Sequence, residues 1–303
     1  MKNASEDILK EVVLIVEENN KEESSAPVCE IELYLFAQQL ELHNIGFCYK
    51  RFLPEDTDKI LQELSDKALQ TLKGRLYISD SEAVIRCLLK QGACVVLLLH
   101  EHNREGNFDG IQYATEGLEG ADYDYLYHVY QRLTGQPWTI LTTNRFVVRE
   151  ITIEDVPALY EIYAEPEVVR YTENLYENVE EELQYTKDYI EKVYGFYGYG
   201  IWIVEDKRTG RIIGRAGLEY KEGREGAELG VVIAKPFWCQ GVATEVVEAI
   251  LTYAKEKLDI FHVFAMVEAE NEKSIRFFTK MQFKYTENEI IHNKTYKIYE
   301  IDI

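Results

Sequence analysis

The first half of the chain alternates between segments with helical hydrophobic spacing and short apolar runs. Residues 54–72 carry apolar side chains three or four positions apart, which predicts a helix that ends before Gly74. Residues 94–99 form an uninterrupted apolar run, as expected of a strand buried on both faces. The predicted elements are a helix in residues 1–20, a helix or a strand in 28–42, helices in 54–72, 81–91 and 122–133, and strands in 75–79, 94–99 and 110–115. This order predicts a smaller α/β, Rossmann-like domain with a parallel sheet and right-handed crossovers.

The pattern changes after residues 135–138, where Gly, Gln, Pro and Trp interrupt it. A new periodicity starts near Thr142, so we expect two domains, 1–141 and 142–303. The elements predicted in the second half are strands in 145–151, 200–205, 211–220, 227–233, 263–268, 283–288 and 294–301, and helices in 153–163, 179–193, 243–258 and 274–281. They predict an α+β fold with a mixed sheet, antiparallel at its start, and flanking helices.

The chain of 303 residues is strongly acidic, with 54 Asp and Glu against 33 Lys and Arg and a net charge of −21. This charge repels polyanions, which argues against nucleic acid as a partner. A cationic substrate would be attracted. The alternative is that the acidity only keeps the protein soluble.

Neither a membrane span nor a metal or disulfide framework is expected. No apolar run approaches the roughly 18 residues of a transmembrane helix, and the first ten residues lack the pattern of a signal peptide. We therefore predict a cytoplasmic protein with no membrane partner. The five cysteines are scattered, with no C-x-x-C pair, which predicts reduced thiols. The sequence leaves a monomer and a homodimer open.

The segment richest in chemistry is the predicted strand 227–233 with the loop and helix that follow it. The helix opens on the small residues Gly241 and Ala243, with Thr244 beside them. The N–H groups at a helix start carry partial positive charge and bind phosphate without Lys or Arg. Small side chains let a pyrophosphate reach the backbone. A plain strand–helix connection would show the same pattern.

This loop resembles the acyl-CoA-binding motif of GNAT acetyltransferases, Gln/Arg-x-x-Gly-x-Gly/Ala, at Trp238, Gly241 and Ala243. Trp stands where the motif has Gln or Arg, and residues 237–245 are similar to the Trp-containing loop of Rim-type ribosomal-protein acetyltransferases. That loop usually has Gly at the position of Cys239. Other segments that resemble the family, in chain order, are 145–150 with 154–155, 168–172, 200–204, 213–218 and 271–283.

The resemblance implies an N-acetyltransferase that uses acetyl-CoA as its co-substrate and needs no metal. The pantetheine would pair with a strand edge that the family leaves open. The residues that the resemblance assigns to acetyl-CoA are Val231, Val232, Ile233, Trp238, Cys239, Gln240, Gly241, Val242, Ala243, Thr244, Asn271 and Ser274. Asn271 is also placed to cap the helix that follows it.

Acetyl transfer to an amine needs a base, because an alkyl ammonium with a pKa near 10 must first lose a proton. Glu228, on the strand that would hold the cofactor, is the first candidate, and Glu219 is the second. Burial would raise the pKa of Glu228 toward neutrality. The alternative for Glu228 is a strand carboxylate that faces solvent or pairs with an Arg. A backbone N–H near Val231 would stabilise the developing oxyanion.

The proton donor to the leaving thiolate is where the chain departs most from the family. Many members have Tyr at the position of Phe278, and Phe cannot donate a proton. We expect Tyr285 or a water to replace it, or the thiolate to leave unassisted. Gln282 also stands where the family usually has Gly. These departures keep a non-catalytic acyl-CoA sensor open as an alternative.

The expected acceptor is a primary amine that attacks acetyl-CoA directly: a protein N-terminus, a lysine, a polyamine or another small amine. Tyr171, Tyr197 and Tyr199 are the predicted substrate-binding residues, because an amine cation can rest on aromatic rings. The alternatives are a tight turn with packed aromatics for residues 194–200, and a core position for Tyr171.

Residues 77–83 together with 91–96 weakly resemble the late strand–helix–strand part of haloacid-dehalogenase-type hydrolases. In that family an Asp, here Asp80, helps to hold magnesium. No Asp-x-Asp-x-Thr/Val motif lies upstream, so we expect a degenerate, non-catalytic module. A bifunctional protein with an N-terminal phosphohydrolase is the alternative. Residues 100–103 are expected to form a solvated loop, not a metal site.

Overall fold

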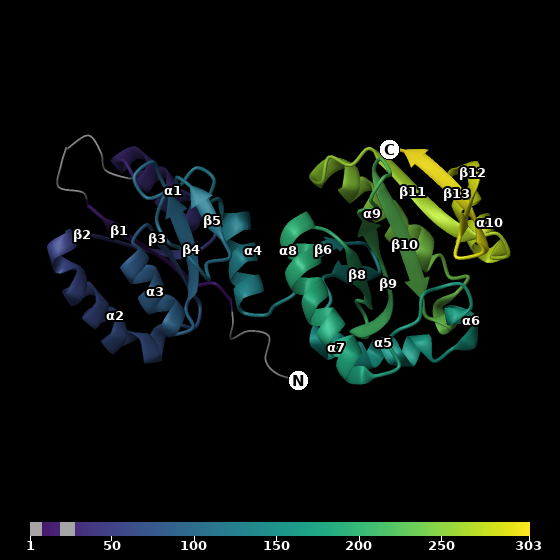
Figure 1. Ribbon diagram of the computed structural model, residues 1–303, viewed down its shortest axis with the longest axis horizontal. Coiled ribbons are helices and arrows are strands. Elements are labelled where there is room, and N and C mark those ends of the chain that lie inside the picture. The colour runs from purple at the N-terminus through teal and green to yellow at the C-terminus, as the bar shows by residue number, and fades with distance from the viewer. Residues whose placement is uncertain (1–7, 19–27) are drawn as a thin grey trace. The chain divides into compact units, whose positions relative to one another are not determined.

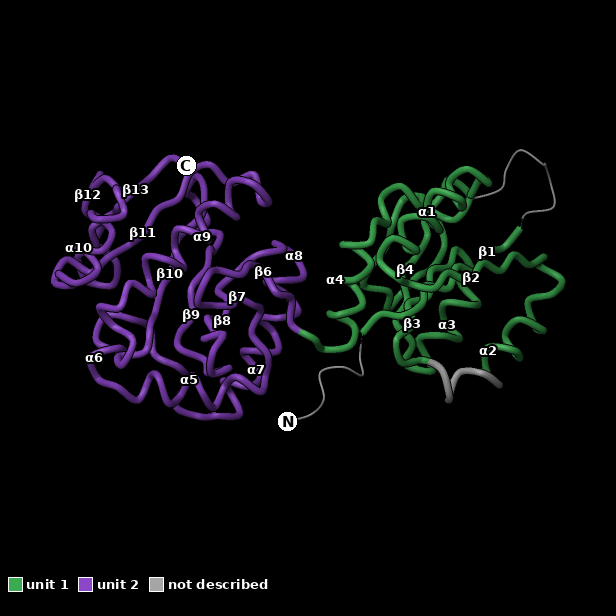
Figure 2. The backbone as a smooth tube through the Cα atoms, turned by 180° about the vertical axis from the view of Figure 1, so that it is seen from behind, with its two compact units in different colours: residues 1–136 green, residues 137–303 purple. Residues whose placement is uncertain are grey.

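The chain folds into two compact units, Met1–Gln136 and Pro137–Ile303 (Figure 2). The structure is a computed structural model that describes residues 8–18 and 28–303, without the side chains of residues 66–71. None of the helices in these residues is long and apolar enough to cross a membrane.

Unit 1 is an α/β unit with a parallel sheet. Its five strands lie in the order β2-β1-β3-β4-β5, and every pair of neighbours is parallel. The strands are β1 (Glu11–Glu17), β2 (Gly46–Phe52), β3 (Arg75–Ser79), β4 (Cys94–Leu99) and β5 (Ala114–Glu116), and the helices are α1 (Glu30–Leu42), η1 (Pro54–Asp56), α2 (Thr57–Thr71), α3 (Glu82–Lys90) and α4 (Tyr123–Leu133). Side chains of α1 and α4 pack on one face of the sheet and those of α2 and α3 on the other.

The predicted helix in residues 1–20 is wrong over its described part, because Glu11–Glu17 forms the strand β1. Val12, Leu14 and Val16 pack into one core and Ile15 into the other, so the segment is apolar on both faces and shows no strand alternation. Residues 1–7 and 19–20 lie outside the described residues. The open choice at 28–42 resolves as the helix α1, and the edge strand β2 was not predicted.

Unit 2 contains one eight-stranded sheet in the order β12-β13-β11-β10-β9-β8-β7-β6 (Figure 1). Its strands are β6 (Thr139–Thr142), β7 (Phe146–Arg149), β8 (Ile201–Asp206), β9 (Arg211–Glu219), β10 (Ala227–Ile233), β11 (His262–Glu268), β12 (Lys284–Ile291) and β13 (Lys294–Asp302). Its helical elements are η2 (Ile153–Asp155), α5 (Val156–Tyr163), α6 (Pro166–Val169), α7 (Val179–Asp188), η3 (Tyr189–Tyr194), α8 (Gly195–Tyr197), η4 (Lys235–Phe237), α9 (Val242–Lys257) and α10 (Glu272–Lys280). All neighbouring strands are antiparallel except β10 and β11.

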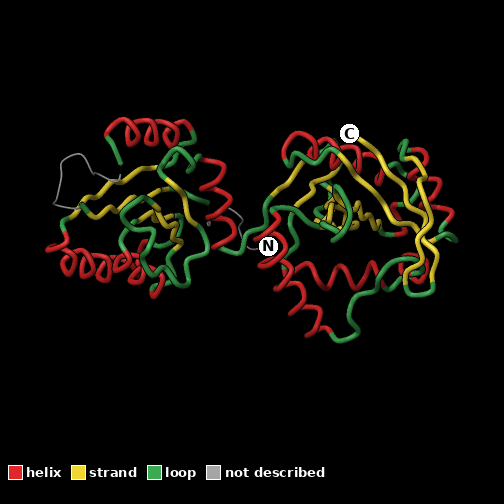
Figure 3. The backbone as a smooth tube through the Cα atoms, turned by 45° about the horizontal axis from the view of Figure 1, so that its top comes forward, coloured by secondary structure: helices red, strands yellow, loops and turns green. Residues whose placement is uncertain are grey.

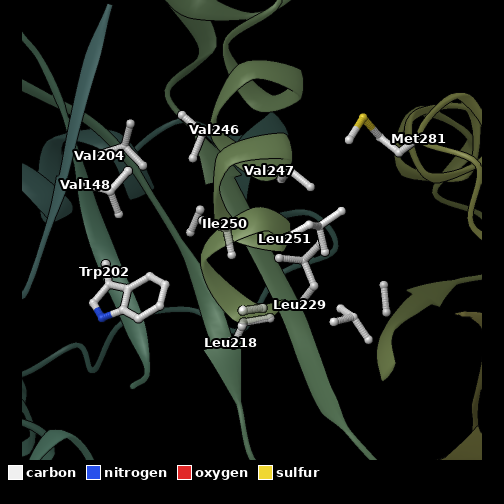
Figure 4. Packing of buried hydrophobic residues seen from close by; sticks show 14 of the residues in the cluster. Val148, Trp202, Val204, Leu218, Leu229, Val246, Val247, Ile250, Leu251 and Met281 are labelled. Atoms are coloured by element: carbon white, nitrogen blue, oxygen red, sulfur yellow. The ribbon is translucent and has the colours of Figure 1, made fainter. Parts of the chain in front are cut away.

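The core of unit 2 lies between the sheet and α9. Val246, Val247 and Ile250 of α9 project toward the strands, where they meet Trp202 and Leu229 (Figure 4). A smaller cluster around α5 and α6 covers the opposite face, so helices flank the strands on both sides (Figure 3). The predicted fold class, a mixed sheet with flanking helices preceded by a smaller α/β unit, is confirmed.

Along the chain, the boundary between the two units falls between Gln136 and Pro137, five residues before the predicted boundary after residue 141. The reason is β6, which was not predicted and which pairs with β7 at the edge of the second sheet. We retain the division into two domains as a proposal.

Gln282 stands in the left-handed region of the backbone, with φ +66°. It follows α10 in a Schellman arrangement, in which the N–H of Phe283 donates to the carbonyl of Phe278 and the N–H of Gln282 donates to that of Thr279. A residue with a Cβ is strained there, which explains why a glycine suits this position.

We expect Gln282→Gly to raise the free energy of unfolding by about 0.5–1 kcal/mol, because it relieves this strain. Urea denaturation of the full chain measures it. Thr279→Gly, inside α10, serves as the control and should lower stability by about 0.3–0.5 kcal/mol. A loss of stability in Gln282→Gly would contradict the expectation.

Candidate active site

The parallel strands β10 and β11 separate soon after they start. They pair at Ala227 with Val263 and at Glu228 with Phe264. Beyond this point β10 remains paired with β9 as far as Ile233, and β11 remains paired with β13 as far as Glu268. From Leu229 onward, the side of β10 that faces β11 is therefore an open strand edge.

A cleft of about 270 Å³ lies at this opening. Its walls include Leu229, Gly230, Val231 and Val232 of β10, and Met266, Val267 and Glu268 of β11. Asn271, Ser274 and Phe278 from the region of α10 line it as well. Asn271 also caps α10, since its side chain accepts a hydrogen bond from the N–H of Ser274 at 3.2 Å. Both expected roles of Asn271 are thus compatible with its position.

The loop between β10 and α9 is held by its own side chains. The indole N–H of Trp238 donates to the carbonyl of Ile233 at 2.6 Å, and the amide of Gln240 donates to the carbonyl of Pro236 at 2.7 Å. Cys239 has φ +58°, a left-handed conformation that suits the Gly usual in the Rim-type loop. These contacts fix the entry to α9.

Gly241 is the N-cap of α9 and also adopts a left-handed conformation, with φ +74°. Val242, Ala243 and Thr244 form the first turn, whose N–H groups have no acceptor within a helix. A phosphate is a suitable acceptor for such groups. These residues are not among those that line the 270 Å³ cleft.

Arg145 and Thr143 hold the start of α9, which the sequence did not indicate. The guanidinium of Arg145 contacts the carboxylate of Glu245 at 2.6 Å and the carbonyl of Gln240 at 3.0 Å. The hydroxyl of Thr143 donates to Glu245 at 2.7 Å. Burial opposes ionisation of Glu245, but the hydrogen bonds from Thr143 and Arg145 outweigh it and lower the pKa of Glu245. The sequence could have indicated Glu245 as a residue that stabilises the start of α9, because a Glu is favourable in a first helical turn. It could not have indicated the partners, because Thr143 and Arg145 lie about a hundred residues away in the chain.

The two candidate bases face each other across neighbouring strands. Glu219 of β9 and Glu228 of β10 are direct partners in the antiparallel register. Glu219 lines the cleft and accepts a hydrogen bond from the hydroxyl of Tyr189 at 3.0 Å. Tyr189 in turn accepts the N–H of Ile201 at 2.8 Å. Burial raises the pKa of Tyr189, so its phenol stays protonated and donates to Glu219.

Glu228 has a different environment. Its carboxylate lies 3.6 Å from the ammonium of Lys221, and it is not among the described residues that line the cleft. Burial raises the pKa of Glu228, Lys221 partly offsets this, and the neighbouring Glu219 adds to it. The sequence also predicted that burial raises the pKa of Glu228.

We expect Glu228→Gln to raise the melting temperature at pH 7. The pKa of Glu228 is higher in the folded protein than in the unfolded chain, so its ionised form costs stability at neutral pH. The difference from wild type should vanish near pH 4, where the carboxyl is protonated in the folded state. Thermal unfolding at the two pH values measures both. A lower melting temperature in Glu228→Gln at pH 7 would show that the contact with Lys221 outweighs burial.

The predicted substrate residues divide into two groups. Tyr171 lines the cleft. Tyr197 stacks on Tyr220 at 5.4 Å between ring centres and lies 6.0 Å from Tyr199, in an aromatic group beyond the residues that line the cleft. Tyr285, the expected proton donor, is half exposed on β12 beside Tyr299, also beyond the lining. The roles of Tyr197, Tyr199 and Tyr285 stay predictions.

The sequence did not indicate a further set of cleft residues on α5, α7, η3 and β9. They include Tyr163, Glu182, Tyr185, Tyr189 and Arg215. Tyr189 begins a π-helical turn that continues α7, a feature that often occurs at functional sites. No local pattern in the sequence distinguishes such a turn from an ordinary α-helix.

Asp80 of unit 1 is buried at the carboxyl end of β3. Its carboxylate accepts the N–H of Glu17 at 2.9 Å and lies 3.3 Å from the ring of His100. Across residues 8–18 and 28–303, no group of three or more His, Cys, Asp or Glu is placed to hold a metal ion. The resemblance of this region to haloacid-dehalogenase-type hydrolases stays a prediction.

Comparison with known proteins finds a family match that lies within unit 2. A family model described as an acetyltransferase (GNAT) domain matches residues 145–284. The uncharacterized N-acetyltransferase YoaA of Bacillus subtilis is 31% identical over 150 residues, which cover 48% of this chain and 82% of YoaA. The uncharacterized protein YkkB of the same organism is 28% identical over 168 residues, which cover 54% of this chain and 95% of YkkB. A crystal structure of a GNAT-family acetyltransferase from Bacillus anthracis covers 54% of this chain and 97% of its own, with 19% identity and a TM-score of 0.47.

Proposed function

The chain belongs to the GNAT acetyltransferase family, and on that premise we propose that a primary amine bound beside Glu219 attacks acetyl-CoA directly in the cleft between β10 and β11. Family membership makes the chain an acyltransferase that uses acetyl-CoA as co-substrate. The proposal concerns the place of the reaction, the residues that perform it and the acceptor.

One observation supports the proposal above all others. The open edge of β10 and the carboxylate of Glu219 belong to the walls of one cleft. An extended pantetheine could pair with the open edge, since unpaired N–H and C=O groups there are available to a bound strand-like group. The thioester at its end would then lie within reach of an amine held by Glu219.

The cleft supplies a group for the deprotonation of the amine and one for the oxyanion. Glu219 takes one proton from the ammonium, directly or through a water, and the neutral nitrogen attacks the carbonyl carbon of the thioester. A backbone N–H of β10 near Val231 stabilises the oxyanion. The C–S bond then breaks, the CoA thiolate leaves, and the second proton of the amine passes to solvent. Holding both reactants together supplies much of the rate.

Phe278 is relevant to the departure of the CoA thiolate. It lines the cleft and cannot donate a proton. Tyr285 lies away from the lining, so we propose that the thiolate leaves without a side-chain acid and is protonated by water. Asn271 and Ser274, on the same wall, would contact the pantetheine.

Thiol release from acetyl-CoA with a panel of acceptors tests the function. The panel contains N-terminal peptides, lysine derivatives, polyamines and small amines, and mass spectrometry identifies each acetylated product. We expect release that depends on an amine and matches its acetylated product mole for mole. Binding of acetyl-CoA without release for any acceptor would instead support the non-catalytic sensor.

A further inference from the structure

Arg215 is the one basic residue among the described residues that line the cleft. It lies on β9 opposite Val232 of β10, and it shares a sheet face with Glu219, four residues further along the strand. Its Nε donates to the hydroxyl of Tyr163 at 2.6 Å, and its guanidinium carbon lies 4.9 Å from the centre of that ring. Tyr163 is buried at the end of α5. The Arg215 side chain is therefore fixed by a rigid neighbour.

The guanidinium of Arg215 has no carboxylate partner within the described part of the chain, in contrast to Arg145 and Arg149 of the same unit. Arg149 contacts Asp155 and Glu205, and Arg145 contacts Glu245. Arginine has five N–H donors, and Tyr163 takes one of them. A half-buried cation with free donors at a cleft is suited to bind an anionic ligand, and its planar fork matches a carboxylate.

Arg215 and Glu219 act on the same region of the cleft. Tyr185, another cleft residue, senses both of them: burial raises the pKa of Tyr185, the charge of Glu219 raises it further and the charge of Arg215 lowers it. Tyr185, Glu219 and Arg215 line the same cleft, so a ligand beside Tyr185 would meet both a negative and a positive group. An amine that also carries a carboxylate presents the opposite pair.

The other acidic residues that line the cleft are Glu173, Glu182 and Glu268, and Glu173 is exposed to solvent. Glu182 is buried, and its carboxylate accepts the N–H of Tyr176 at 2.9 Å. Glu268 lies 2.7 Å from the ammonium of Lys294. Glu182 and Glu268 thus each already have a protein partner, and solvent screens the charge of the exposed Glu173. An acceptor that carries only positive charges would be repelled by Arg215 at close range.

We propose that Arg215 binds a carboxylate of the acceptor, so that the substrates are amines that bear a carboxylate, such as amino acids and their derivatives. The proposal rests on the proposed function and narrows its substrate class. Arg215 is then a specificity-determining residue that touches the acceptor, while Tyr163 positions it.

The test compares two acceptors that differ in one group, an amino acid and its carboxamide. The chain is assayed as wild type, Arg215→Gln and Arg211→Gln, with kcat/KM for each acceptor. Arg211 is an exposed arginine on the same strand and is not part of the cleft lining, so its variant removes the same charge and serves as the matched control.

We expect wild type to prefer the carboxylate by at least about tenfold, as one charge-assisted hydrogen-bonded pair supplies. Arg215→Gln should lose about 10–100-fold for the carboxylate and change little for the carboxamide. Arg211→Gln should change neither. Arg215→Lys, which keeps the charge without the fork, should fall between wild type and Arg215→Gln.

Equal use of both acceptors by wild type would overturn the proposal and leave the proposed function standing. An equal loss for both acceptors in a folded Arg215→Gln would overturn it as well. If Arg215→Gln does not fold, the preference of wild type and the effect of Arg215→Lys decide between the outcomes. Acetyl-CoA turnover with no amine at all would count against the proposed function itself.

Discussion

Replacing Glu219 by Gln should lower kcat at least about 100-fold, within the range usual for a general base. Gln keeps an oxygen that can accept the hydrogen bond from Tyr189, so the cleft should keep its shape while the base is lost. The KM for acetyl-CoA should stay close to that of wild type, because the proposed cofactor contacts lie on β10, at the start of α9 and on α10. Steady-state kinetics with a saturating amine measures both constants.

Glu228→Gln is the matched control for this experiment. It changes the same residue type on the neighbouring strand, directly opposite in the register. We expect kcat to fall less than about threefold, because Glu228 contacts Lys221 and does not line the cleft. If Glu228→Gln were the severe variant and Glu219→Gln the mild one, the base would be Glu228, the residue that the sequence placed first.

Replacing Gly217 by Ala should destabilise the fold by at least about 3 kcal/mol, a loss that few single substitutions reach. A Cβ at Gly217 would lie 2.0 Å from the carbonyl oxygen of Gly200 and 2.8 Å from the Cα of Ile201. Both of these atoms belong to the backbone, so the clash can be relieved only by moving β8 away from β9. Because Ile201 lines the cleft, activity should be lost with the fold.

Gly195→Ala provides the comparison. Gly195 is helical, and a Cβ there would meet no other described atom within 4 Å. Ala should be neutral or slightly stabilising at this position. Denaturant unfolding of both variants measures the contrast. A Gly217→Ala protein as stable as wild type would mean that β8 and β9 do not approach as closely as described.

The second unit was predictable from sequence almost element by element, since its strands alternate and its helices have clear ends. The first unit was harder for a physical reason. Residues 12–16 of β1 are packed on both faces of a parallel sheet. Their apolar side chains therefore show neither the helical period of about 3.6 residues nor the strand period of about 2. The edge strands β2 and β6 are partly exposed and lack a continuous apolar signal.

The site was predictable where it depends on local sequence. Gly241 and Ala243 at a helix start, and Asn271 as a cap, could be read from spacing alone. The separation of β10 from β11 could be expected only from the family resemblance, because no local pattern encodes where two parallel strands stop pairing.

The choice between Glu219 and Glu228 could not be read from sequence at all. The two carboxylates are direct partners in the register and lie on one face of the sheet. Glu228 occupies the last pair that β10 makes with β11, whereas Glu219 borders the opening beside Tyr189. The contacts of Arg145 and Arg215 likewise join segments that are far apart in the chain.

Hydrogen–deuterium exchange with and without CoA tests most directly whether the cleft between β10 and β11 holds the cofactor. We predict that CoA slows exchange in residues 229–233 of β10 and in residues 242–244 at the start of α9, with no change in the sheet of unit 1. Protection confined to residues 28–136, or unchanged exchange across β10 and α9 despite calorimetric binding of CoA, would contradict this placement.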